Sequence, residues 1–582
     1  MLDLLFTEAT VIDGTGAPPR VMDVAVADGR IAQVGRIDRK ARTTIDARGA
    51  WLTPGFIDIH THYDGQANWD QTFSPSIHHG ITTVVMGNCG VGFAPLRPGR
   101  QADLIDLMEG VEDIPGVALA EGIDFRWESF PQFMDTLEAI PHSLDFLLQV
   151  PHDPLRMYVM GERAMAREEA SKEDIAAMQG LLREALQAGA AGFSTGRTDD
   201  HRTASGRDTP SSIAGVEELI GIAGAFAGLK RGVLQMVSDF DLMRGPQYFQ
   251  AEFNLVEELA RASGRPLSMT WLQRDPGGEQ YQLIRQRLDI AVGNGLPLYL
   301  QTAARGIGVI IGLDTGFQPF MGFPSYREVA TLPLAERAAA MREPRRRARI
   351  LAERSERLAV DQTPVPPLVD ILLERIETIS ARLFALGAIP NYEPALTDSF
   401  LYHARRRGVT ALETLYDHLA EGDGGNLIYF PIFNYNEGSL DVVAQMLNHP
   451  RALAGLGDAG AHIATKCDAS FSTFMLTHWA RDRAEGRLPI ERVVEMLSSR
   501  NARYLGLRDR GRIALGQRAD LNLIDPHRLK LPAPQLLPDL PAGGKRFMQK
   551  SEGYVGTWVA GQRVTQHGKV TAARPGRLVR MR

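Results

Sequence analysis

The chain has 582 residues, a length that suits one large barrel with additional segments better than a single average domain. Hydrophobic residues make up 44% of it and charged residues 23%, the mixture of an ordinary globular protein, which argues against extensive disorder or a membrane protein. The formal net charge of -6 gives no electrostatic reason to expect nucleic acid as a partner.

The chain contains two cysteines, Cys89 and Cys467, so a framework of disulfide bonds is not expected to stabilise it. The first residues, MLDLLF, lack the basic start of a signal peptide. No run of eighteen uninterrupted apolar residues occurs either. These features predict a cytoplasmic protein without a membrane partner, and they leave open whether it forms a homo-oligomer.

Both ends of the chain are rich in short strand-like runs. In residues 1–53 these runs are separated by Asp-Gly pairs, which favour hairpin turns. A comparable pattern returns in residues 511–524 and 559–564. We therefore expect residues 1–53 and 505–582 to pair with each other in one small β-sandwich.

Residues 54–504 alternate strand-like runs with amphipathic helical stretches, the pattern of repeated βα units. Clear helical stretches are residues 171–188, 215–227 and 252–263. Eight such units would close into a (β/α)8 TIM barrel. The expected strands lie near residues 56–60, 82–86, 145–150, 191–195, 233–237, 267–271, 297–302 and 453–457.

The connection before the last expected strand, about residues 305–450, is far longer than an ordinary loop. We expect it to be an insertion that folds separately or covers the barrel as a lid. Within it, residues 336–357 form a strongly charged helical run, which predicts a solvated helix face.

The first expected strand ends in two histidines, His60 and His62, within the run PGFIDIHTH of residues 54–62. In a strand, residues i and i+2 point to the same face, so the two imidazoles would lie side by side and could share one metal ion. This run resembles the start of the first barrel strand in the amidohydrolase superfamily. Residues 80–90, GITTVVMGNCG, are similar to the second-strand motif of its D-aminoacylase (N-acyl-D-amino-acid deacylase) branch.

The resemblance implies a metal-dependent amide hydrolase in which His60, His62, Cys89 and Asp458 bind zinc. Asp458 follows the apolar run of residues 452–457, where a carboxylate is poorly explained as part of the core. In the superfamily the aspartate at this place binds metal and handles the proton of the attacking water. The other interpretation of Cys89 is a small buried apolar side chain.

The small-molecule substrate implied is an N-acyl amino acid or a related amide. Two alternatives stay open: hydrolysis of a cyclic amide or carbamate, and a binding protein without catalysis on a degenerate barrel.

The chain departs from the branch at the ends of strands five and six, where the branch carries histidines. Neither residues 234–240 nor residues 266–273 contain one, and Gln273 stands where the branch has a lysine that holds the substrate carboxylate. We therefore predict one tightly bound Zn²⁺ rather than two. Asp239 and His462 are the candidates for a further ligand or for a neighbour of the ligands, although Asp239 could equally cap a helix and His462 could equally be structural.

Four residues near the expected mouth of the barrel are candidates for substrate binding: Trp271, Gln273, His201 and Arg197. Trp271, together with the aromatic residues Tyr299, Phe240 and Phe317, suggests an aromatic or bulky acyl group. For any one of these rings, a place in the core is the simpler interpretation.

Overall fold

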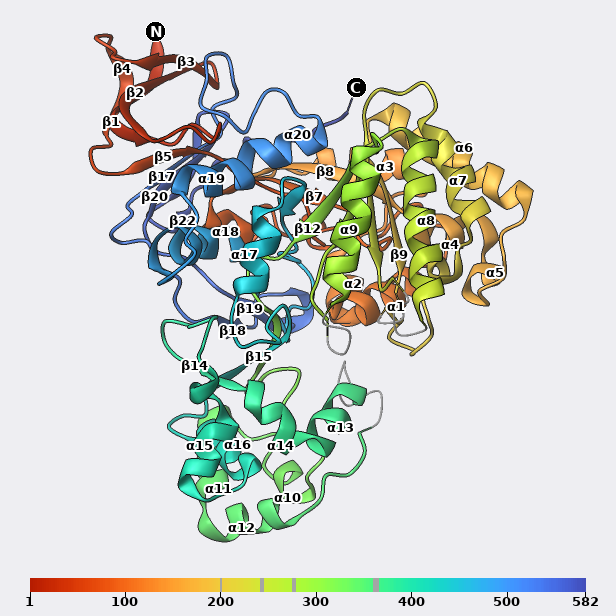
Figure 1. Ribbon diagram of the computed structural model, residues 1–582, viewed down its shortest axis with the longest axis vertical. Coiled ribbons are helices and arrows are strands. Elements are labelled where there is room, and N and C mark those ends of the chain that lie inside the picture. Colours follow the sequence, from red (N-terminus) through yellow and green to blue (C-terminus); the bar gives the residue numbers. More distant parts are fainter. Residues whose placement is uncertain (199–200, 241–244, 275–278, 359–365, 582) are drawn as a thin grey trace.

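The computed structural model describes residues 1–198, 201–240, 245–274, 279–358 and 366–581, and its centre is a barrel of parallel strands (Figure 1). Eight strands follow one another in space in the order in which they occur in the chain: β6 (Phe56–Asp58), β7 (Ile81–Met86), β8 (Asp145–Pro151), β9 (Gly192–Arg197), β10 (Val233–Ser238), β11 (Leu267–Thr270), β12 (Leu298–Thr302) and β16 (Ala452–Ala454). The segments that follow β6 and β16 meet where the His62 amide donates to the Ala459 carbonyl at 2.8 Å. The predicted TIM barrel is confirmed.

Helices cover the outside of the barrel between these strands: α1 (Gln101–Glu112), α2 (Gly116–Gly122), α3 (Phe130–Glu138), α4 (His152–Met160), α5 (Glu162–Met165), α6 (Lys172–Ala188), α7 (Val216–Ala223), α8 (Pro246–Ser263), α9 (Gln280–Gly293), α17 (Asp441–Asn448), α18 (Phe471–Phe474), α19 (Ile490–Glu495) and α20 (Asn501–Leu505). The long helix α6 begins where its sequence predicts. Ser171 accepts from the amide of Asp174, and the Asp174 side chain accepts from the amide of Ser171, so both ends of this capping box are satisfied.

Both ends of the chain join in one nine-stranded sheet, as the β-rich termini predict (Figure 1). The N-terminal strands are β1 (Leu2–Val11), β2 (Arg20–Ala27), β3 (Arg30–Gly35), β4 (Ala41–Asp46) and β5 (Trp51–Pro54). The C-terminal strands are β17 (Leu521–Ile524), β20 (Tyr554–Val559), β21 (Gln562–Gln566) and β22 (Lys569–Val570). The two sets meet where β5 pairs with β17 in antiparallel register, Leu52 opposite Leu523. The limits of each domain at residues 53 and 504 stay a prediction.

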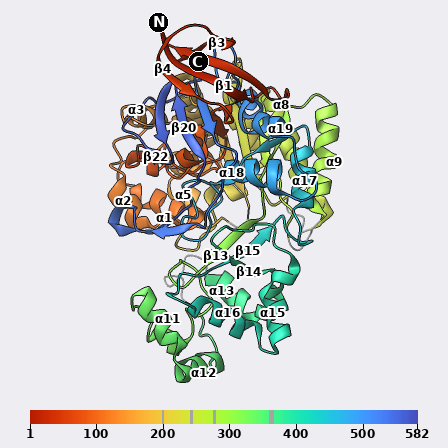
Figure 2. The same ribbon diagram turned by 90° about the vertical axis from the view of Figure 1, so that its left-hand side faces the viewer.

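The long connection between β12 and β16 forms a lobe that projects from the barrel (Figures 1 and 2). Its sheet consists of β13 (Ile307–Ile311), β15 (Leu427–Phe433) and β14 (Phe384–Leu386). Its helices are α10 (Pro324–Arg327), α11 (Leu334–Arg342), α12 (Pro344–Ala352), α13 (Pro366–Glu374), α14 (Ile376–Ile379), α15 (Phe400–Arg407) and α16 (Ala411–Ala420). A separate apolar cluster, which includes Phe320 and Tyr416, holds it together.

The charged run of residues 336–357 forms most of α11 and all of α12, which are separated at Glu343. Arg347 on α12 pairs with Asp417 on α16 at 2.8 Å, so some of these charges link helices instead of facing only solvent. Two further strands, β18 (Gln535–Leu537) and β19 (Arg546–Met548), pair with each other near the lobe (Figure 1). In the described part of the chain, no helix is long and apolar enough to cross a membrane.

Candidate metal centre

His60 and His62 directly follow β6, and both side chains are only 1% exposed. The Nδ1 atom of His60 lies 2.6 Å from Oε1 of Gln301, which in turn donates from Nε2 to the Ser268 hydroxyl at 2.9 Å. Because an amide oxygen only accepts, Nδ1 of His60 carries the proton. The lone pair of Nε2 is therefore free on the other side of the ring, in the orientation that a metal ligand needs.

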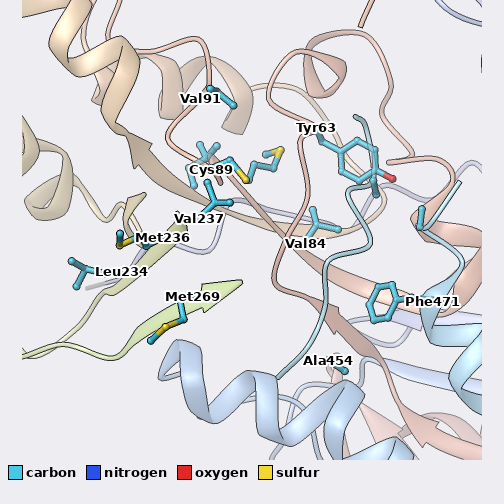
Figure 3. Packing of buried hydrophobic residues seen from close by; sticks show 14 of the residues in the cluster. Tyr63, Val84, Cys89, Val91, Leu234, Met236, Val237, Met269, Ala454 and Phe471 are labelled. Atoms are coloured by element: carbon cyan, nitrogen blue, oxygen red, sulfur yellow. The ribbon is translucent and has the colours of Figure 1, made fainter. Parts of the chain in front are cut away.

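Cys89 lies in a tight turn after β7, and its Sγ atom is 3.2 Å from Nε2 of His60. Its backbone is left-handed, with φ of 59°, a conformation that is uncommon for residues other than glycine. The turn is held by side chains of neighbouring strands: Gln235 accepts from the Cys89 amide at 2.7 Å, and Ser194 accepts from the Gly90 amide at 3.0 Å. Figure 3 shows Cys89 beside Val237 at the end of β10.

Asp458 follows β16, which lies beside the segment after β6 where the barrel closes, with Oδ1 3.5 Å from Nε2 of His60. Three residues that are not glycine, Leu456, Asp458 and His462, have positive φ in this short loop. Such conformations persist where the surrounding structure enforces them, and they are frequent at functional sites. The Asp458 side chain is 18% exposed, whereas those of His60 and Cys89 are buried, so Asp458 is the one of these three that an incoming molecule can reach.

Glu112 joins this group although the sequence interpretation did not select it. It is the last residue of α1, and its Oε1 atom lies 3.2 Å from Nδ1 of His62. His462 lies on the other side of the carboxylate, with Nε2 3.8 Å from Oε2 of Glu112. The sequence did carry a signal: Leu104, Met108 and Glu112 are spaced by four, so a glutamate occupies the buried stripe of an amphipathic helix.

Protonation states in this cluster favour a bound cation. Burial lowers the pKa of His62 well below its usual value, so the imidazole is neutral and can act as a ligand. Burial likewise raises the pKa of the Cys89 thiol well above its usual value, and a metal ion would be needed to stabilise the thiolate there. His60, His62 and Cys89 each offer a donor atom within 4.8 Å of the others. Two imidazoles and a thiol form a donor set that fits zinc.

A cavity beside Asp458 is also lined by Lys466, Asp468 and Arg546. Arg546 is paired with Asp539 through two hydrogen bonds, and Asp468 is paired with Arg305. Lys466 was not among the residues selected from the sequence. Among the described residues, no carboxylate lies within ion-pairing distance of its ammonium group. Its charge nevertheless acts on His62, Cys89 and Glu112.

Two of the predicted candidates make structural ion pairs instead of facing the cluster. Asp239 accepts from Arg274 at 2.6 Å and from the Thr198 hydroxyl at 2.7 Å. Arg197 makes a bidentate pair with Glu252 at 2.8 and 2.9 Å. His201 does lie near the cluster, since a Cβ atom on Gly196 would be 2.5 Å from the Cys89 carbonyl oxygen and 3.6 Å from Nδ1 of His201. Burial lowers the pKa of His201 to about 4.

Trp271 and Gln273 are placed away from an open mouth. The Trp271 indole is 1% exposed and donates to the Tyr281 carbonyl at 2.8 Å, with its ring against Tyr281 of α9. The Gln273 amide donates to the Glu437 carboxylate at 2.7 and 2.9 Å, which connects the end of β11 to the lobe.

The other aromatic candidates are not at the mouth either. Phe240 and Phe317 are buried, and Tyr299 packs against Tyr504 in the barrel interior. These three rings therefore pack in or against apolar clusters, which is the simpler of the two interpretations.

The barrel, the terminal sheet and a histidine, cysteine and aspartate cluster at the strand ends define a TIM barrel with a candidate metal centre. The sequence profile of the amidohydrolase family matches residues 43–565, so this chain belongs to the amidohydrolase family.

Two similar proteins are deacylases by name. The chain is 39% identical over 195 residues to a D-aminoacylase of Alcaligenes xylosoxydans xylosoxydans, covering 33% of this chain and 37% of the relative. It is 39% identical over 224 residues to an N-acyl-D-aspartate deacylase of the same organism, covering 38% and 42%. The matched part thus spans about two fifths of the length of these relatives.

The fold also matches a solved structure of N-acyl-D-glutamate deacylase from Bordetella bronchiseptica, complexed with zinc and a phosphonate inhibitor. The TM-score is 0.62 at 24% identity, covering 100% of this chain and 99% of the other.

Proposed function

We propose that this protein is a zinc-dependent deacylase that hydrolyses the amide bond of N-acyl-D-amino acids. The observation that carries the proposal is the convergence of Cys89 Sγ and Asp458 Oδ1 on one nitrogen, Nε2 of His60, at 3.2 and 3.5 Å. Membership of the amidohydrolase family and the similarity to two D-specific deacylases support the choice of substrate.

In this proposal His60, His62, Cys89 and Asp458 hold the ion. When bound, zinc would supply Lewis-acid chemistry, polarising the scissile carbonyl and making water more acidic. Gln301 keeps His60 in the tautomer that binds metal, through the contact to Nδ1. The backbone around Cys89 is held by Gln235 and Ser194, so the thiol is positioned before any ion arrives.

Asp458 is the proposed acid-base residue. Its side chain is more exposed than the two histidines, so it can reach both the attacking water and the leaving nitrogen. It would accept the proton of the water and return it to the amine as the carbon–nitrogen bond breaks. Lys466 lines the same cavity and carries the charge needed to bind the carboxylate of the substrate.

The ligand count favours one tightly bound ion. The strands that carry histidines elsewhere in the branch end here in Ser238 and Thr270, and hydroxyl groups are weak zinc ligands beside imidazole and thiolate. Asp239 is paired with Arg274 and is not available as a substitute.

The test is a comparison of hydrolysis rates for N-acyl-D-amino acids, their L enantiomers, and D substrates whose carboxyl group is converted to an amide. We expect the D acids to be hydrolysed fastest and the capped substrates to be poor. Chelation should abolish activity, and Zn²⁺ should restore it, with about one zinc per chain after dialysis on the ligand-count argument. Full activity of metal-free protein, or two zinc ions per chain that both resist dialysis, would contradict the proposal.

A further inference from the structure

Glu112 is in a place where a negative charge is unfavourable. It is the last residue of α1, the helix end at which the macrodipole disfavours anions. Its side chain is 2% exposed, so the carboxylate has also lost most of its hydration. A carboxylate in this place stays ionised only with a compensating cation close by, and Lys466 offsets only part of the effect of burial.

The contacts of Glu112 point toward His62. Oε1 of Glu112 and Nδ1 of His62 are 3.2 Å apart, yet the two are not aligned as a hydrogen bond. Nδ1 of His62 is a buried nitrogen for which the described residues provide no hydrogen-bond partner. An imidazole nitrogen without a partner and a carboxylate oxygen thus lie beside one another inside the protein, which is an arrangement that a shared ion would satisfy.

The spacing is the one that two ligands of a single ion adopt. Two donor atoms, each 2.0–2.1 Å from a tetrahedral zinc, are about 3.3 Å apart. The His62–Glu112 separation of 3.2 Å and the His60–Asp458 separation of 3.5 Å both fit this value. A well-formed hydrogen bond between imidazole and carboxylate would be nearer 2.8 Å.

We propose that Glu112 is a ligand of the metal centre, a carboxylate that α1 contributes in place of the donors that β10 and β11 lack. The proposal rests on the proposed function only in requiring that the cluster binds a metal ion. His462, 3.8 Å from the second carboxylate oxygen, would hold Glu112 in the orientation for coordination. Glu112 of α1 would then share an ion with His62, which follows β6.

Two variants separate coordination from a structural role. Glu112→Gln keeps the shape of the side chain and removes the charge. Asp113→Asn is the matched control, since it removes one charge from the next residue, whose carboxylate accepts from the Thr465 hydroxyl. Zinc content after dialysis, competition with a coloured chelator, and thermal unfolding with and without Zn²⁺ are measured on the full chain.

We expect Glu112→Gln to bind zinc on the order of 100-fold more weakly than the unchanged protein. Residues that only hydrogen-bond to a metal ligand typically change metal affinity by about 10–100-fold, so a loss at or above the top of that range fits a ligand. Without metal, the melting temperature of this variant should equal or exceed that of the unchanged protein, because burying a neutral amide costs no more than burying a carboxyl group that has no cation beside it. The increase in melting temperature on adding Zn²⁺ should be smaller. Asp113→Asn should keep the zinc affinity of the unchanged protein.

Unchanged zinc affinity in Glu112→Gln would overturn the proposal, and so would equal losses in both variants, which would indicate a general effect of charge. If Glu112→Gln fails to fold, Glu112→Asp serves instead: it keeps the charge but withdraws the oxygens by about 1.5 Å, one carbon–carbon bond. Weakened zinc binding is expected there too, and unchanged binding would refute coordination. An unchanged protein that binds no zinc at all would refute the proposed function itself.

Discussion

At the scale of single residues, the proposed function divides the cluster into groups that only hold the ion and a group, Asp458, that also transfers a proton. His60 and His62 are buried and fixed, whereas Asp458 keeps part of its side chain toward the cavity that Lys466 also lines. Removing a group of the second kind should affect turnover far more than metal content.

Asp458→Asn tests this division. The amide keeps the size of the side chain and can still offer an oxygen to metal, but it cannot take a proton from water. We expect kcat to fall by on the order of 10²-fold or more, the usual scale for loss of an acid-base group. Zinc content and melting temperature, measured on the same sample, should change little. Near-normal turnover would remove Asp458 from the mechanism.

The sequence placed His60, His62, Cys89 and Asp458 at strand ends, and the fold brings all four together. The helical spacing marks Glu112 as buried, but the sequence could not place Glu112 or Lys466 beside His62, because each becomes its neighbour only when α1 and the loop after β16 fold against the barrel. Trp271 was misplaced for a different reason. Leu267, Met269 and Trp271 are alternate residues of one extended segment, so their side chains point to the same face of the sheet. That face packs against the surrounding helices, so the position of Trp271 in the strand already directs its ring away from the barrel interior.

At the scale of elements, the turn that carries Cys89 depends on close approach of two backbones. Gly90 has φ of 82°, and a Cβ atom there would lie 2.8 Å from the backbone nitrogen of Gly196 on β9. Only glycine fits this contact without moving one strand end relative to the next. The position of the Cys89 thiol therefore depends on a neighbour that has no side chain.

Gly90→Ala should therefore lower both stability and zinc affinity. The left-handed conformation alone costs an alanine roughly 1–2 kcal/mol, and the backbone contact adds to that. Gly99→Ala is the control, because Gly99 has φ of 79° but nothing within 4 Å of its Cβ position. We expect the melting temperature to fall further in Gly90→Ala than in Gly99→Ala, with weaker zinc binding only in the former. Equal effects would show that the contact with β9 does not position the turn.

At the scale of the whole molecule, the C-terminal segment completes the barrel as well as the terminal sheet. The first residue of β8, Asp145, is fully buried. Arg510 and Arg518 bind its two carboxylate oxygens at 2.6 and 2.9 Å, and the Arg577 amide donates to it at 3.0 Å. These partners are more than 360 residues away in the chain, which is why local sequence could not reveal how the strand is held.

Arg510→Met should be strongly destabilising for this reason. The side chain of Arg510 is 2% exposed, and methionine retains much of its apolar length while removing the charge. Breaking a buried ion pair from one side leaves the other charge uncompensated, at a cost of about 3–5 kcal/mol. Arg512→Met, at an exposed position two residues further on, should change the free energy of unfolding by no more than about 0.5 kcal/mol. Urea unfolding of both variants measures the difference, and equal stability would show that Arg518 and the Arg577 amide suffice to hold Asp145. A large loss in Arg510→Met alone would show that the end of the chain stabilises the third barrel strand.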